Sequence, residues 1–98
     1  MKPVVRLGDK SMGESEFPPT LLTEGSQNVF ANGISVGAVG SKWKPHTRKV
    51  EPNDTHTEIC VEGSSTVYAN GVPLCRIGDK LAFDDVIIEG SQNVFAGG

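Results

Sequence analysis

Apolar and polar residues alternate along short stretches of this chain, and glycine interrupts them every few positions. The stretch Gln27–Ala31 alternates in this way, and Ile34–Val39 follows it directly after Asn32-Gly33. An Asn-Gly pair between two alternating segments is typical of a two-residue hairpin turn, which requires positive φ at both central residues. The pattern therefore predicts a β-hairpin here, with Ile34–Val39 as the return strand.

The same pattern is written three times. EGSQNVFANG at Glu24–Gly33 returns as EGSSTVYANG at Glu62–Gly71 and as EGSQNVFAGG at Glu89–Gly98. The second copy predicts another hairpin, formed by Ser65–Ala69 and Val72–Ile77 around Asn70-Gly71. The chain is therefore a threefold repeat of one hairpin unit.

The third copy ends on the strand Gln92–Ala96 and has no return strand after it. The missing partner stands at the other end of the chain, because PVVRLGDK at Pro3–Lys10 matches PLCRIGDK at Pro73–Lys80. We expect Gln92–Ala96 to pair with Pro3–Leu7. The predicted fold is all-β: three β-hairpin repeats about a pseudo-threefold axis form a small cone with long loops and no substantial helix. We expect a single domain over residues 1–98, with repeats at approximately 3–33, 34–71 and 72–98.

Composition narrows the class of protein. Ninety-eight residues make at most one small domain. The net charge of −3, from 9 basic and 12 acidic residues, argues against a nucleic-acid surface, which needs a basic stripe. No apolar run is long enough to cross a bilayer, and the N-terminus lacks the apolar core of a signal peptide. We expect synthesis in the cytoplasm and reduced cysteines.

The longest loop, Ser41–Val61, carries most of the residues with metal-binding chemistry. Its His46, His56 and Cys60 are spaced ten and four apart, and Cys75 lies on the following return strand. Imidazoles and thiolates suit tetrahedral Zn²⁺ or iron. A polar loop of some twenty residues without secondary structure cannot order itself by burial, so one metal ion would order it. We expect Trp43 to be exposed in this loop.

Other interpretations of these residues stay open at this level. Both histidines could lie on the surface, and Cys75 could simply belong to the core, since free cysteine is often buried as a small apolar residue. A disulfide between Cys60 and Cys75 is a further alternative. Asp79 follows a glycine at a strand end, where a turn explains it better than catalysis does. We expect the acidic residues of the loop 10–23 to be solvated surface.

The repeated unit, which runs from Glu-Gly-Ser through Asn-Gly to Gly-Asp-Lys, resembles the PAAR-repeat family. The match covers residues 3–10, 24–42 and 62–98, with the copies in the right order. The resemblance implies a metal-stabilised tip that caps a trimeric β-helical spike in a contractile phage tail or a type VI secretion system. It implies one chain per trimer, transient contact with a target membrane, and assembly at the tip of the virion tail or secretion spike.

Carried onto this sequence, the resemblance implies metal ligation by His46, His56 and Cys60, with Cys75, Asp54 or water as the fourth ligand. The family often uses three histidines and one cysteine, so a chain with two histidines departs from that pattern. Gly40-Ser41-Lys42 also departs from Gly-Asp-Lys at the second corner.

Two rival functions remain at the level of sequence. The first is an adaptor that attaches effector or other proteins to the spike tip through the loop 41–61 and Trp43. The second is a metallo-hydrolase, in which Glu58 would be the general base. We expect no enzyme, no small-molecule substrate and no nucleic-acid partner.

Overall fold

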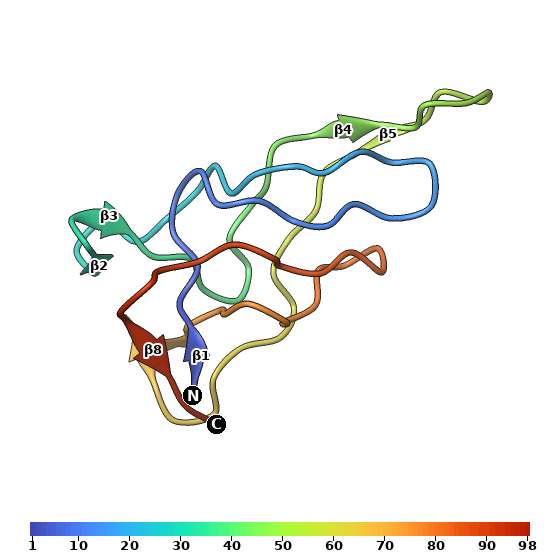
Figure 1. Ribbon diagram of the computed structural model, residues 1–98. Helices are drawn as coiled ribbons and strands as arrows, with labels where there is room; N and C mark the ends of the chain where they lie inside the picture. Colours follow the sequence, from blue (N-terminus) through green and yellow to red (C-terminus); the bar gives the residue numbers. More distant parts are fainter.

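The computed structural model describes all 98 residues and contains strands but no helix, hence none that could span a bilayer. Four antiparallel pairs join the strands: β1 with β8, β2 with β3, β4 with β5, and β6 with β7 (Figure 1). The all-β hairpin architecture is therefore confirmed. The strands are β1 (Lys2–Pro3), β2 (Phe30–Ala31), β3 (Ile34–Ser35), β4 (His46–Thr47), β5 (Thr55–His56), β6 (Tyr68–Ala69), β7 (Val72–Pro73) and β8 (Phe95–Ala96).

Both Asn-Gly pairs form the turns that the sequence predicts. Asn32 and Gly33 have φ values of 57° and 76°, and Asn70 and Gly71 have 53° and 81°. Positive φ at both central residues matches the right-handed twist of the flanking strands. These turns connect β2 to β3 and β6 to β7.

The two ends of the chain lie side by side. Lys2 of β1 faces Ala96 of β8, and Pro3 faces Phe95. The pairing continues inward, where the Val4 amide donates to the Val94 carbonyl at 3.0 Å. Figure 1 shows both termini at the same end of the molecule.

The three return segments, residues 3–7, 34–39 and 72–77, hydrogen-bond to one another in a cycle. The Val5 amide donates to the Cys75 carbonyl, the Cys75 amide to the Gly37 carbonyl, and the Gly37 amide to the Val5 carbonyl, each at 3.0 Å. In a second cycle, the amides of Leu7, Val39 and Ile77 each donate to a carbonyl of another return segment. A Cβ on Gly37 would meet side-chain carbons of Leu22 and Val5 at 2.7 and 2.9 Å, so any larger residue there would displace these core side chains.

Two apolar clusters fill the interior. The smaller one lies under the paired hairpins and contains Val4, Ala31, Val36, Ala69, Leu74 and Ala96. The other lies toward the loops and contains Val5, Leu22, Trp43, Cys60, Cys75, Leu81 and Ile87. The prediction that Trp43 is exposed was wrong: its indole is fully buried.

The loops between the repeats extend to one side of the molecule, away from the termini and from β2 and β3 (Figure 1). The sequence predicted that the longest of them, residues 41–61, has no secondary structure. The structure differs. This segment folds back on itself through β4 and β5, and the Trp43 amide donates to the Glu58 carbonyl at 3.0 Å. Its two limbs can pair because Trp43 and Cys60 anchor both ends of the segment in the core.

Candidate metal centre

Four side chains meet among the loops at the far side of the molecule from the termini. Glu14, His46, His56 and Glu58 each direct one metal-ligand atom toward a common centre, and these atoms lie within 4.8 Å of one another. Glu14 comes from the first loop. The other three come from the β4–β5 hairpin and the residues just after it. This group can hold a metal ion.

The two histidines face each other because β4 and β5 pair with His46 directly opposite His56. Their Nε2 atoms are 2.7 Å apart. The Nδ1 atom of His46 lies 2.7 Å from the Pro18 carbonyl oxygen, which can only accept a hydrogen bond. Nδ1 therefore carries the proton, and the Nε2 of His46 keeps a lone pair for a metal. A histidine whose second nitrogen is held by a carbonyl is the usual arrangement around protein-bound metals.

Aromatic rings hold the second imidazole in place. His56 is stacked between Phe17, with ring centroids 4.1 Å apart, and Phe83, with centroids 4.2 Å apart. Phe17 belongs to the first loop and Phe83 to the third. The centre therefore joins all three loops, and an ion bound there would link segments that are distant in sequence.

Glu58 is fully buried, which is unusual for a carboxylate without a cation. Its Oε2 lies 3.2 Å from the Nε2 of His56 and 3.3 Å from that of His46. Its Oε1 accepts a hydrogen bond from the Phe83 amide at 3.0 Å. One oxygen is therefore held by the third loop, while the other faces the centre.

Glu14 adds a second carboxylate, whose side chain is 10% exposed. Its Oε1 lies 3.5 Å from the Nε2 of His46 and has no hydrogen-bond partner, although it is shielded from solvent. Burying two carboxylates side by side costs free energy unless a cation neutralises them. Two imidazoles and two carboxylates at this separation match the tetrahedral set that Zn²⁺ accepts. The donor chemistry thus fits a divalent metal ion.

The crowding of negative charge is visible in the acid–base behaviour of Glu14. Burial and the neighbouring Glu58, with smaller effects of Asp85 and Asp84, raise the pKa of Glu14 to about 8. At neutral pH the metal-free protein therefore keeps a proton on Glu14, and a metal that binds this carboxylate displaces that proton.

A pH dependence follows for the metal-free protein. Folding raises the pKa of Glu14 from 4.5 to about 8. The contribution of Glu14 to the unfolding free energy is therefore largest below pH 4.5 and is lost as the pH rises toward 8. Glu14→Gln should remove this loss, so that the difference in unfolding free energy between variant and parent changes across pH 5–8. Urea denaturation in the presence of a chelator measures this difference.

The matched control is Glu16→Gln, which changes a glutamate two residues away that lies outside the group and is exposed. Its difference from the parent should stay constant with pH. A constant difference for Glu14→Gln as well would contradict the raised pKa.

The structure brings together two of the four ligands predicted from sequence. His46 and His56 lie in the group, whereas Cys60 and Cys75 lie in the neighbouring apolar cluster and are fully buried. The indole N–H of Trp43 donates to the Cys60 sulfur at 3.2 Å. The hydrogen bond with Cys60, together with burial, raises the pKa of Cys75, which therefore stays a thiol in this arrangement. Ligation by the two cysteines stays a prediction.

Sequence reasoning missed Glu14 as a ligand and considered Glu58 only as a base. Glu14 was expected on the solvated surface, but its loop closes tightly and turns the side chain inward: the Glu14 and Phe17 amides each donate to the other's carbonyl. Glu58 follows His56 by two but lies outside β5, and the sequence predicted a loop there, so no shared strand face marked it. No signal in the sequence marks Glu14 either.

The fold and the site define a small all-β protein with repeated hairpins and a candidate metal centre among its loops. The family model for the PAAR motif matches residues 12–89, about four fifths of the chain. The chain therefore belongs to the PAAR-motif family. A search of curated proteins gave no match.

Proposed function

We propose that this protein is the metal-stabilised tip of a contractile injection machine, such as a phage tail or a type VI secretion system. One chain would cap the end of a trimeric β-helical spike, with the hairpins toward the spike and the loops toward the target membrane. The three repeats would be arranged about a pseudo-threefold axis and would narrow toward the loops. Such a role needs no catalytic step.

The observation that carries this proposal is a repeated set of exposed aromatic side chains. Phe30, Tyr68 and Phe95 occupy the same position in the three repeats and are 55%, 52% and 44% exposed. Each directly precedes an alanine, which leads into an Asn-Gly turn in the first two repeats and to the end of the chain in the third. Exposed aromatic residues are typical anchors of protein interfaces. A trimer of identical chains ends in three identical surfaces, and a single chain with three copies of one aromatic can meet all three.

The metal belongs to the same proposal. We infer that Glu14, His46, His56 and Glu58 hold one zinc ion, with iron as the alternative. The ion would fasten the three loops to one another at the end that meets the membrane. Loops of unequal length with little apolar content gain order from such a site, because binding energy becomes folding energy.

The stoichiometry tests the cap. Mixed with its cognate spike trimer, the protein should elute as a complex of one chain per three spike chains in size-exclusion chromatography with light scattering. Replacing Tyr68 by aspartate should weaken the complex roughly tenfold or more, since it places an unpaired charge at an apolar contact. A complex of three chains per trimer would contradict the proposal.

Val50→Asp is the matched control for this experiment. Val50 is also exposed and apolar, but it lies beyond β4 at the far end of the longest loop. The proposal expects the control to bind the spike as tightly as the parent. Equal weakening by both variants would show that the hairpin aromatics do not form the contact.

A further inference from the structure

Each repeat has a corner at the end of its return segment, and two of the three corners carry an arginine–aspartate pair. We call these the first flank, Arg6 and Asp9, and the third flank, Arg76 and Asp79. At both flanks the arginine amide donates to the aspartate Oδ2 at 2.8 Å, and the guanidinium pairs with the same carboxylate. The pair is therefore a repeated structural element.

The second flank departs from this rule. The equivalent residues are Ala38 and Ser41. The Ala38 amide donates to the Ser41 hydroxyl oxygen at 3.1 Å, so the backbone of the corner keeps its conformation. What is missing is the guanidinium and the carboxylate that holds it.

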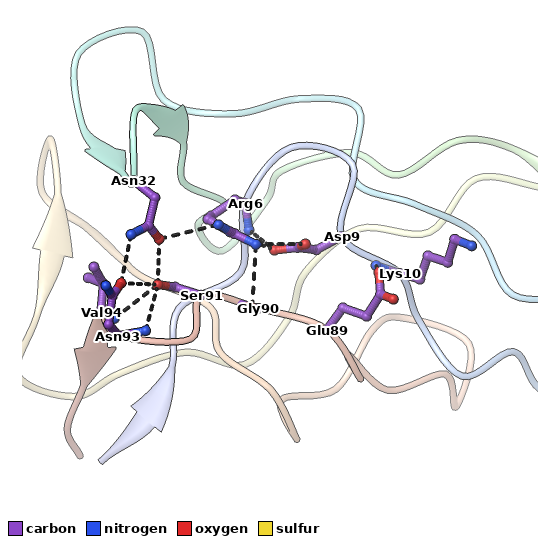
Figure 2. A network of polar contacts seen from close by, with 9 residues as sticks. All are labelled: Arg6, Asp9, Lys10, Asn32, Glu89, Gly90, Ser91, Asn93 and Val94. Carbon is purple, nitrogen blue, oxygen red and sulfur yellow. Dashed lines mark hydrogen bonds and ion pairs between the residues drawn. The ribbon is translucent and has the colours of Figure 1, made fainter.

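At the first flank the guanidinium links two hairpins. Arg6 donates to the Asn32 side-chain oxygen at 3.2 Å and to the Gly90 carbonyl at 3.4 Å, as Figure 2 shows. At the third flank Arg76 donates in the same direction, to the Gly97 carbonyl at 2.9 Å. An arginine side chain therefore spans the gap to the end of the neighbouring strand, or to the turn after it, at both of these flanks.

At the second flank the corresponding acceptors are left over. Asn70 and Gly25 stand where Asn32 and Gly90 stand at the first flank. The Asn70 amide nitrogen donates to the Asn28 side-chain oxygen at 2.8 Å, but neither the Asn70 Oδ1 nor the Gly25 carbonyl accepts a hydrogen bond within the chain. Two oxygens that face a guanidinium elsewhere in the molecule are thus free here.

A hollow of about 420 Å³ lies at this flank and is lined by Glu24, Gly25, Ser41 and Asn70, among others. Its lining includes no lysine and no arginine, and its single formal charge is the Glu24 carboxylate. The Oε1 of Glu24 accepts the Lys42 amide at 3.2 Å, which leaves Oε2 for another donor. A hollow also exists at the first flank, about 620 Å³ in volume, but there Arg6 itself forms part of the wall.

We propose that the second flank is a binding site for an arginine side chain of a second protein. The guanidinium would take the position that Arg6 and Arg76 hold at the other flanks. Its N–H groups would donate to the Asn70 Oδ1 and to the Gly25 carbonyl, and the Glu24 carboxylate would attract its charge from nearby, as Glu62 does for Arg76. The fork of a guanidinium matches several separated oxygens at once, which the point charge of a lysine does not.

The site would make one of the three flanks of the molecule different from the other two. Three aromatic residues repeat at the hairpin ends, but only one flank lacks its own arginine. A protein that docks through this flank would therefore bind one side of the molecule with a stoichiometry of one to one. The experiment below needs no spike protein, so this contact can be established even if the proposed cap is wrong.

The probe for the experiment is N-acetyl-arginine amide, titrated into the full chain labelled with ¹⁵N. We expect amide shifts confined to Gly25, Ser41 and the Asn70 side chain, with a dissociation constant of roughly 1–10 mM, since a few exposed hydrogen bonds supply only a few kcal/mol. N-acetyl-citrulline amide has the same shape without the charge and should bind at least fivefold more weakly. Equal binding of the two compounds, or shifts at the first flank instead, would overturn the proposal.

Two variants complete the test. Ala38→Arg with Ser41→Asp installs the pair found at the other flanks and should abolish the shifts by filling the site. Glu24→Gln keeps the acceptor for the Lys42 amide but removes the charge, and should weaken arginine binding roughly fivefold. If the double variant does not fold, Glu24→Gln alone tests whether the second flank binds arginine. Unchanged affinity in Glu24→Gln, or shifts that persist in a folded double variant, would contradict an arginine site here.

Discussion

Replacing His46 by alanine should release the metal ion and lower the midpoint of thermal unfolding by roughly 15 °C or more. His46 is buried and its Nε2 atom faces Glu58 and Glu14. A metal present at a thousand times its dissociation constant stabilises the folded state by about 4 kcal/mol, and each kcal/mol shifts the midpoint by about 4–8 °C in a domain of this size. Metal analysis of the purified protein and calorimetry measure the two effects.

The control for this experiment separates the two ligand sets. A variant with Cys60 and Cys75 both changed to alanine should lose stability through its smaller core side chains but keep one equivalent of metal. Loss of the metal from that variant would assign the cysteines to the centre. An intact protein that binds no zinc or iron would contradict the metal centre altogether.

Replacing Arg76 by alanine should cost about 3–5 kcal/mol of unfolding free energy, because it leaves the fully buried Asp79 carboxylate without its partner. Arg76 also donates to the Gly97 carbonyl and so holds the last strand. The only other cation near Asp79 is Lys2, whose ammonium is 4.0 Å away and half exposed. Urea denaturation measures the loss as a lower midpoint.

Arg6→Ala is the matched control, since Arg6 makes the same pair with Asp9 at the equivalent corner. The side chains of Arg6 and Asp9 are 19% and 13% exposed, whereas those of Arg76 and Asp79 are 3% and 0% exposed. Water can solvate Asp9 after the change, so we expect a loss of only about 1–2 kcal/mol. Equal losses for the two variants would mean that burial does not set the strength of these pairs.

Much of the fold could be predicted because its signals are local. Asn32-Gly33 and Asn70-Gly71 specify turn type through φ, and alternation assigns the strands around them. The interior of the longest loop could not be predicted in this way. Trp43 is a large apolar residue in a polar segment, and its burial depends on Leu22 and Cys60, which lie far away along the chain.

The candidate site was half predictable for the same reason. His46 and His56 are rare residues in one segment, so their chemistry stands out without knowledge of the fold. Glutamate is common on surfaces, so Glu14 and Glu58 carry no such signal. Only the approach of the first loop to β4 and β5 reveals that two carboxylates lose their water at the same point.

The cycle of hydrogen bonds among the return segments has a consequence for self-association. A strand at the margin of a sheet offers unpaired amides and carbonyls to any strand of another molecule. At the centre of this chain, Val5, Gly37 and Cys75 already satisfy one another in a closed loop of donors and acceptors. A second copy therefore finds no row of free peptide groups there to extend, and crowding many copies together would not propagate a sheet through their centres.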